Sequence, residues 1–370
     1  MGVSADSSTL AAIVVLAMKT KITQLLGIKY PVIMAAMAWI GDVNLAVAVS
    51  KAGGLGTLGP NAGQVEVTRD VFETGERLRE QIRQIRRLTN KPFAVNFVVG
   101  VPGLDREFSD RCVEVGIEER VPIAIVSQGD PKVYTSKLKD AGMKVLHCCS
   151  SVEQAKKVEG AGADAVISTG FEGGGHTGFY EVTTFCLVPA ISDAIRIPVI
   201  AAGGIGDARG LVASLALGAE AIYMGTRFIA TKECRAHTKV KKLIIDSDET
   251  SSVAIRHGFM GQQGPGDRGF KEERRGVLRM LVDEYIRENL DKEGYTYEAL
   301  APFMVLPSPE KGGSSTAASL VYGDIDYHAI MAGGQVCGVI NDIPTCEELI
   351  KRIIDDAKAI LETIKLKILT

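Results

Sequence analysis

Short runs of apolar, often β-branched residues recur along the first two-thirds of the chain, and each run ends in glycine or a polar residue. Such runs are typical of buried strands. They are apolar almost without interruption, which is the pattern of parallel strands in a sheet that is covered on both faces. Eight strands are predicted in this way, over residues 31–37, 54–59, 93–99, 123–128, 144–149, 165–169, 198–202 and 221–225.

Amphipathic stretches separate most of these runs. Val71, Leu78, Ile82 and Ile85, for example, recur at helical spacing, with Arg and Glu on the other side. Eight strands that alternate with helices within about 200 residues fit a closed (β/α)8 barrel better than an open doubly wound sheet. We therefore predict an α/β protein with a TIM barrel.

The composition changes after residue 256. Glycine-rich 258–269 predicts a loop, and a charged stretch over about 270–293 predicts a helix. Apolar residues at helical spacing over 346–364, with Thr345 and Glu348 as a capping box, predict a last helix that closes the barrel wall.

We therefore expect a barrel domain over 18–255, a small helical lid over 256–340 and a C-terminal helix over 341–370 that returns to the barrel. Residues 1–17 are expected to lie outside the fold. Their apolar run is too short to span a bilayer. No basic residue precedes it, which argues against a signal peptide.

The chain has 370 residues, of which 46% are hydrophobic and 24% charged, and its net charge is −3. These are the proportions of an ordinary globular protein, and the charge supplies no strong positive field for nucleic acid or anionic lipid. The seven cysteines include no Cys-x-x-Cys pair, and no Cys/His cluster has the spacing of a zinc site. We predict a cytoplasmic protein with reduced thiols, no metal, no nucleic-acid partner and no membrane segment.

Functional groups of a TIM barrel gather at the carboxyl ends of its strands. The sixth predicted strand is followed by Gly173, Gly174, Gly175 and then His176. Consecutive glycines allow a flat ligand to approach the backbone closely. The position of His176 favours a catalytic role, and a structural histidine in a turn is the alternative.

Glycine-rich turns also follow the last two predicted strands. Gly203 and Gly204 follow the seventh, and Gly225 and Thr226 follow the eighth. Amides in such turns bind anions, and in TIM barrels these two loops frequently hold phosphate. The pair therefore predicts a phosphate-bearing cofactor. No Gly-x-Gly-x-x-Gly follows a strand and opens a helix, which disfavours a Rossmann dinucleotide site.

Two further strand ends suit a flavin. Asn96 interrupts an apolar strand, and an amide can donate to and accept from the edge of a flavin pyrimidine ring. The alternative is an asparagine that bonds to the neighbouring backbone. Ala35 and Ala36 leave room for a ring at the end of the first strand, and Met37 offers a soft apolar contact.

These motifs resemble the nitronate monooxygenase family, once called 2-nitropropane dioxygenases, which also includes the flavin-dependent enoyl-acyl-carrier-protein reductase II. The segments that carry the resemblance are 172–178, 198–205 and 217–228, and Ala332-Gly333-Gly334-Gln335-Val336 matches a further pattern of the family. The resemblance extends from about Ile22 to Glu362.

The resemblance implies FMN as the cofactor. Its phosphate would lie on the backbone at Gly204, Gly225 and Thr226, Asn96 would meet the isoalloxazine, and His176 would face the substrate. The other cofactor-binding residues that we predict are Ala35, Ala36, Met37, Gly174, Gly175, Gly203 and Gln335. The family loop usually reads Glu-Ala-Gly-Gly-His, so Gly173 is a departure, as are Thr177 and Met34. These departures leave the substrate open.

Our leading hypothesis is an FMN oxidase that converts alkyl nitronates with O2 to a carbonyl compound and nitrite. The second is an enoyl-thioester reductase that uses NAD(P)H and FMN, and the first strand favours that branch. A flavin-binding protein without redox turnover is a third class, which a catalytically placed histidine argues against. The substrate is a small molecule in the first two cases, and a homodimer remains open.

Overall fold

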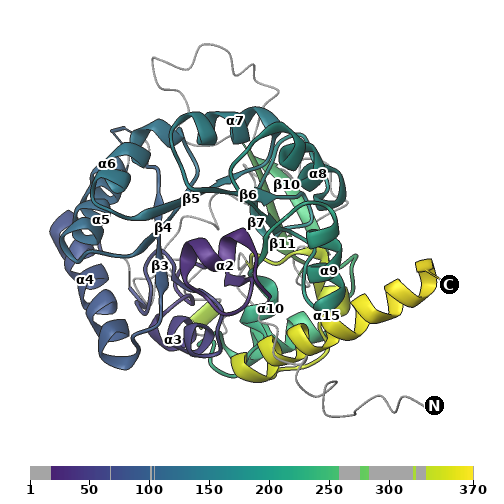
Figure 1. The fold of residues 1–370 in the computed structure, drawn as a ribbon. Helices are drawn as coiled ribbons and strands as arrows, with labels where there is room; N and C mark the ends of the chain where they lie inside the picture. The colour runs from purple at the N-terminus through teal and green to yellow at the C-terminus, as the bar shows by residue number, and fades with distance from the viewer. Residues whose placement is uncertain are drawn as a thin grey trace, which may run out of the picture.

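The computed structural model describes residues 18–66, 68–100, 102–103, 105–257, 276–282, 320–321 and 331–369. Eight parallel strands form a ring with helices outside it (Figure 1), in the order β1-β9-β8-β6-β5-β4-β3-β2. Their bounds are β1 Val32–Met34, β2 Gly56–Leu58, β3 Phe93–Val98, β4 Ile123–Ser127, β5 Lys144–Cys149, β6 Ala165–Thr169, β8 Val199–Ala202 and β9 Ala221–Met224. Each lies within or at a predicted run, so the TIM barrel is confirmed.

Helices alternate with these strands along the chain. They are α2 Lys21–Leu26, α3 Val43–Lys51, α4 Val71–Leu88, α5 Arg106–Glu118, α6 Thr135–Asp140, α7 Val152–Gly160, α8 Thr184–Ala194, α9 Ala208–Ala216, α10 Thr226–Ile229, α11 Thr238–Asp246 and α15 Cys346–Leu369. Two short 3-10 turns are η1 Pro131–Val133 and η2 Gln335–Val339.

Successive residues of each barrel strand face opposite sides, because side chains alternate along a strand. Ala94 and Ile125 belong to a cluster inside the ring, whereas their neighbours Val95 and Val126 belong to the larger cluster between strands and helices. The ring closes where the Leu55 N–H donates to the Val32 carbonyl, at 2.9 Å.

The amino end of the barrel is closed by α2. This helix lies over the centre of the ring in Figure 1, and its Ile22 and Leu26 join the inner cluster. Reciprocal hydrogen bonds between Thr20 and Thr23 cap its start. Gly27 ends it with φ +67°, the left-handed conformation that glycine adopts without strain. The apolar plug therefore sits at the end opposite the strand ends where chemistry was predicted.

The last helix completes the wall. α15 packs against α9 and α3, and its apolar stripe is buried in the main cluster as far as Ala357. The predicted capping box is confirmed, because Thr345 N–H donates to Glu348 and Glu348 N–H donates to Thr345. Beyond the barrel, the helix projects from the body (Figure 1), and Leu361, Ile364, Leu366 and Ile368 are exposed.

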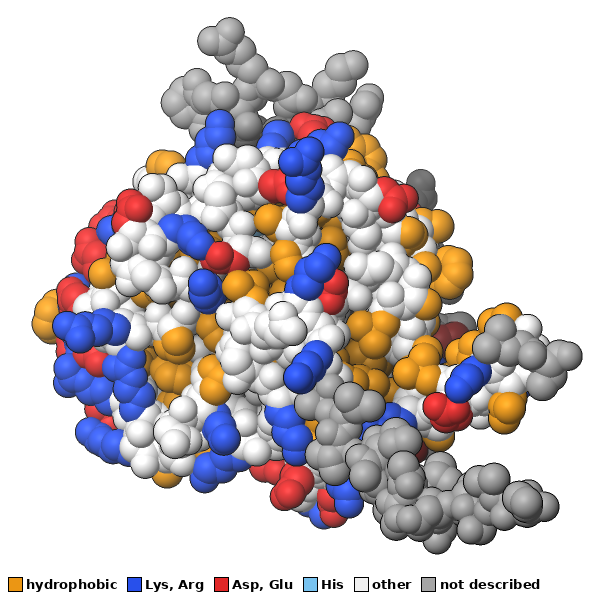
Figure 2. All heavy atoms as spheres, in the orientation of Figure 1, with side chains coloured by type: hydrophobic (Ala, Val, Ile, Leu, Met, Phe, Trp, Pro, Cys, Tyr) orange, Lys and Arg blue, Asp and Glu red, His pale blue; other side chains and the backbone are white. Residues whose placement is uncertain are grey.

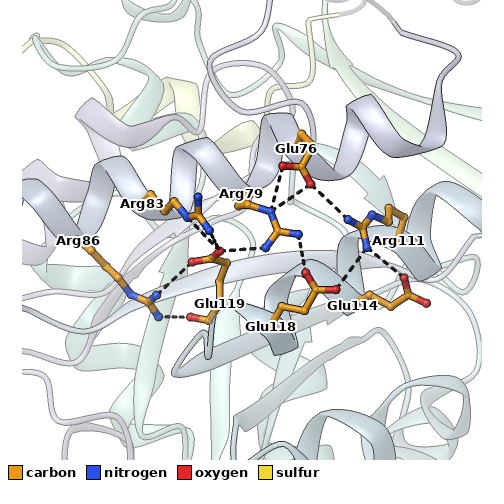
Figure 3. A network of polar contacts seen from close by, with 8 residues as sticks. All are labelled: Glu76, Arg79, Arg83, Arg86, Arg111, Glu114, Glu118 and Glu119. Atoms are coloured by element: carbon orange, nitrogen blue, oxygen red, sulfur yellow. Dashed lines mark hydrogen bonds and ion pairs between the residues drawn. The ribbon is translucent and has the colours of Figure 1, made fainter.

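An ion-pair network joins α4 to α5 on the outside of the barrel (Figure 3). Arg79 contacts Glu76, Glu118 and Glu119, at 3.1, 2.5 and 3.0 Å. Arg111 from α5 reaches back to Glu76 at 3.3 Å. Charged side chains accordingly cover the left edge of the molecule in Figure 2, whereas apolar side chains gather on the right, where α15 leaves the body.

A second sheet lies beside the barrel, with the order β10-β11-β7. β7 is Gly175–Thr177, β10 is Ser252–His257 and β11 is Gly276–Leu281, and both pairings are antiparallel. The helix predicted over about 270–293 is therefore wrong at β11. The apolar side chains of β11 are buried on both faces of the sheet, so no period-2 pattern marked it as a strand.

The structure bears on the other sequence-based expectations only in part. The predicted segment 1–17 and most of the predicted lid lie outside the described residues. All seven cysteines are free thiols. Within the described ranges, no helix is both long enough and apolar enough to cross a membrane, and no group of potential ligands is arranged to hold a metal ion.

Candidate active site

Polar side chains line the barrel interior at the carboxyl ends of the strands. Each is in phase with an inner-cluster residue two positions earlier, as Asn96 is with Ala94 and Tyr223 is with Ala221. The set consists of Thr57, Asn96, Ser127, Cys148, Thr169 and Tyr223. The inner layer is thus apolar near α2 and polar at the opposite mouth.

The loop from β6 to β7 packs against the segment 333–335, backbone to backbone. A β-carbon at Gly174 would lie 2.7 Å from this segment, so only glycine fits without a shift. The N–H of Gln335 donates to the carbonyl of Glu172 at 3.0 Å. The preceding N–H donates to the Thr226 hydroxyl at 3.1 Å. These contacts bring the predicted residues on β7, α10 and η2 together.

The turn after β8 has the backbone of an anion site. Gly203 and Gly204 both have positive φ, +98° and +70°, which turns successive amides in one direction. Among the described residues, nothing accepts a hydrogen bond from the amides of Gly204, Ile205 and Gly206. Adjacent amides without internal acceptors can bind the oxygens of a phosphate.

The ends of β9 and β1 meet at this mouth. A β-carbon at Gly225 would lie 3.5 Å from Cβ of Ala35 and 4.0 Å from Sδ of Met37. The N–H of Ala36 donates to the Tyr223 hydroxyl at 2.7 Å. The predicted residues of the first strand and of the turn after β9 therefore form one continuous surface.

His176 lies on β7, directly opposite Leu278 of β11. The imidazole is exposed to solvent at the rim, whereas Leu278 and Met280 on the same face of the sheet are buried. The imidazole keeps solvent-accessible surface, but the protein packed around the rim desolvates it in part and so lowers the pKa of His176 below its ordinary value. The neutral form, which accepts a proton, therefore predominates at pH 7.

A sequence profile of the nitronate monooxygenase family matches residues 19–356. The chain belongs to the nitronate monooxygenase family. Members of this family are oxidoreductases that generally depend on a flavin. The amides after β8, which have no acceptor within the described ranges, and the surface formed by Ala35, Met37 and Gly225 fit a phosphate-bearing flavin.

Relatives within and around this family carry different names. A carboxyl-CoA dehydrogenase of Mycobacterium tuberculosis, specific for a methyl-oxo-octahydroindene skeleton, is 32% identical over 94% of this chain and 98% of its own length. The solved structure of FabK from Thermotoga maritima is 35% identical, covers 95% of this chain and 99% of its own, and superposes with a TM-score of 0.77. A probable nitronate monooxygenase of Staphylococcus saprophyticus is 36% identical over 64% of this chain and 75% of its own.

Asn96 already has partners in the barrel wall. Its Nδ2 donates to the Ile125 carbonyl at 3.0 Å and to the Ser127 hydroxyl at 3.1 Å. Both amide hydrogens are therefore used within the sheet, which is the structural alternative stated for this residue. Its Oδ1 accepts from Ser127 only at 3.4 Å, so a role toward the flavin would rest on this oxygen.

Two residues beside the site were missed by sequence reasoning. Glu172 accepts from both the N–H and the hydroxyl of Thr184, at 2.9–3.0 Å, and thereby holds the glycine loop against α8. Arg279 of β11 donates to the Phe171 carbonyl at 2.9 Å. A single arginine in the apolar run 277–282 was the signal for Arg279. The Glu172 contact had no sequence signal beyond its place beside the glycines.

Proposed function

We propose that this protein is an FMN-dependent oxidoreductase of acyl thioesters, with NAD(P)H or NAD(P)+ as the other redox partner. Within this family the proposal is supported by a single contrast. The thioester enzyme of M. tuberculosis and FabK, an enoyl-acyl-carrier-protein reductase, are 32% and 35% identical and each match at least 94% of this chain. The solved nitroalkane oxidase of Streptomyces ansochromogenes covers 93% of this chain but is only 25% identical, and the S. saprophyticus nitronate monooxygenase matches 64%.

FMN, when bound, carries two electrons between a nicotinamide and the α,β carbons of the thioester. The amides of Gly204, Ile205 and Gly206, for which the described part of the chain supplies no acceptor, would hold its phosphate together with Gly225 and Thr226. Ala35 and Met37 would lie under the ring. The small side chain at Ala35 and the missing one at Gly225 leave space there.

His176 would exchange the proton at the α-carbon. Its lowered pKa makes it a base at neutral pH in the direction of dehydrogenation. In the direction of reduction, the same imidazole returns that proton. The exposed position at the rim lets a bulky acyl carrier remain outside the barrel while the acyl group reaches the flavin.

Nitronate oxidation is the second candidate. The family profile and the S. saprophyticus relative carry that name. A base of lowered pKa also suits removal of a proton from a neutral nitroalkane. This activity needs no nicotinamide, since the nitronate itself reduces the flavin and O2 completes the reaction.

Anaerobic mixing separates the two candidates. Purified protein reconstituted with FMN is mixed with NADH or NADPH, and separately with ethyl nitronate, while the oxidised flavin absorbance is followed. We expect fast bleaching by a nicotinamide and recovery of the absorbance on addition of crotonyl-CoA. Bleaching by ethyl nitronate without response to either nicotinamide would reverse the order of the candidates. A protein that cannot be reconstituted with FMN would overturn both.

A further inference from the structure

Arg279 is an arginine with only 4% of its surface exposed, in the sheet that carries His176. Its Nη1 donates to the carbonyl and hydroxyl of Ser252 at 3.3 and 3.2 Å. Its Nε donates to the Phe171 carbonyl. Desolvation lowers the pKa of Arg279, and the charges of Glu172 and Glu181 oppose this effect. Its hydrogen-bond partners among the described residues are all neutral, and burying a cation on neutral partners costs free energy, so we looked for a contribution of Arg279 that offsets this cost.

The register of the sheet places Arg279 behind His176. Arg279 lies opposite Gly175, and the next position pairs Leu278 with His176. Because neighbours on a strand face opposite sides, Arg279 and His176 are on opposite faces. The guanidinium lies 4.6 Å from the centre of the Phe171 ring. The Arg279 guanidinium therefore links β10, β11 and the start of the glycine loop on the face of the sheet opposite His176.

We propose that Arg279 is the positioning residue for His176: it holds the carbonyl and ring of Phe171 and thereby fixes the glycine loop that leads into β7. This rests on the proposed function, in which His176 exchanges a proton with the substrate. The loop needs an external hold, because Gly173, Gly174 and Gly175 restrict the backbone little by themselves.

The geometry requires arginine rather than a generic cation. The planar guanidinium donates to Phe171 and Ser252 at the same time and stacks on an aromatic ring. Lysine offers a point charge without the fixed fork. Arg279→Lys therefore retains a positive charge and removes the hold on the loop, whereas Arg279→Gln removes both.

The first measurement is turnover by FMN-loaded Arg279→Lys. We expect the flavin content to be unchanged, kcat to fall by about 10- to 100-fold, as for a displaced catalytic group, and KM to change little. Arg111→Lys is the matched control, since Arg111 is a partly buried arginine in the α4–α5 network away from the site. It should leave kcat unchanged. An unchanged kcat in Arg279→Lys would overturn the proposal.

The second measurement does not depend on turnover. The imidazole of His176 is titrated by NMR, with His176→Gln used for assignment. In Arg279→Lys, we expect the pKa of His176 to rise toward its ordinary value, because β7 moves away from the protein that desolvates the ring. A rise in Arg279→Gln alone would mean that Arg279 acts only as a charge, together with Glu172 and Glu181 near it, and would also overturn the proposal.

Phe171→Leu provides a second route if Arg279→Lys does not fold. It removes the ring beneath the guanidinium and retains the backbone carbonyl, so the same changes are expected at smaller size. Failure of the proposed function is distinguishable from failure of this inference. A protein inactive on thioesters and nitronates refutes the function, whereas the titration of His176 still tests the position of the loop.

Discussion

The two ends of the barrel are built from the same strands and have opposite character. Near α2, the inward residues are apolar, as at Ala94 and Leu146. Two positions further along the same strands they are Asn96 and Cys148. Because successive inward residues of a strand lie at successive levels of the barrel, one strand can contribute to stability at its start and to chemistry at its end.

Backbone strain follows the same division. Five non-glycine residues have positive φ in the described chain, which costs energy in side chains with a β-carbon. Trp39, Asn61, Gln128 and Glu181 lie in loops at the carboxyl ends of strands, and only Arg120 lies at the other end. Backbone strain in the described chain is thus concentrated at the carboxyl ends of the strands, where the loops form the candidate site, and is rare at the end that α2 closes.

The largest expected effect is at the mouth. His176→Ala should retain FMN, because the residues proposed to hold the phosphate and to lie under the ring are on other strands, and should lower turnover by roughly 10²- to 10⁴-fold. Thermal unfolding should shift little, since the side chain is exposed. Steady-state kinetics and flavin absorbance check both parts. Loss of the flavin in His176→Ala would show that His176 also contributes to flavin binding, which would contradict this prediction.

The sealed end should respond in stability alone. Ile22→Ala empties part of the plug, since Ile22 is fully buried, and should cost about 2–5 kcal/mol of unfolding free energy. Turnover per bound flavin should be unchanged. Denaturant titration measures the first and kinetics the second. Leu366→Ala is the matched control, because Leu366 is 64% exposed and its loss should be nearly neutral.

Two glycines with the same backbone conformation compare the ends directly. Gly203 and Gly218 have φ of +98° and +99°. Alanine at either position should cost on the order of 1–2 kcal/mol of stability. Only Gly203→Ala should also weaken FMN, because its β-carbon would lie 2.9 Å from the Gly170 carbonyl in the cofactor turn. Fluorescence titration with FMN measures the affinity of each variant. Equal affinities for Gly203→Ala and Gly218→Ala would contradict the proposal that the phosphate binds at the turn after β8.

The smallest effect concerns pH. Burial lowers the pKa of His147, whose Nδ1 donates to the Cys148 carbonyl at 2.9 Å. As the pH falls below about 6.5, the unfolded chain binds a proton that the folded chain excludes, so stability falls. His147→Asn retains a donor and should flatten this decline in denaturant titrations between pH 7 and 5.

The barrel was predictable because its information is local. Each strand is an apolar run between turns, and Gly203 and Gly204 after β8 mark a left-handed turn in the sequence itself. β11 was not predictable, since its pairing partner β7 lies about a hundred residues earlier, and a glycine-rich segment of the sequence separates β11 from β10. The contacts of Arg279 depend on that long-range pairing, and the partners of Asn96 depend on the pairing of β3 with β4, so residue types alone could not reveal either set.

The position of α15 in the ring has a consequence for folding. The helix that covers the flanks of α3 and α9, Cys346–Leu369, is separated along the chain from every strand of the barrel by more than a hundred residues. Until it docks, the apolar surfaces that Ile350, Ile353 and Ala357 cover are exposed, even in a chain whose eight barrel strands have paired. Completion of the wall therefore depends on a long-range contact, and a chain in which α15 has not docked presents an apolar surface that is prone to aggregation.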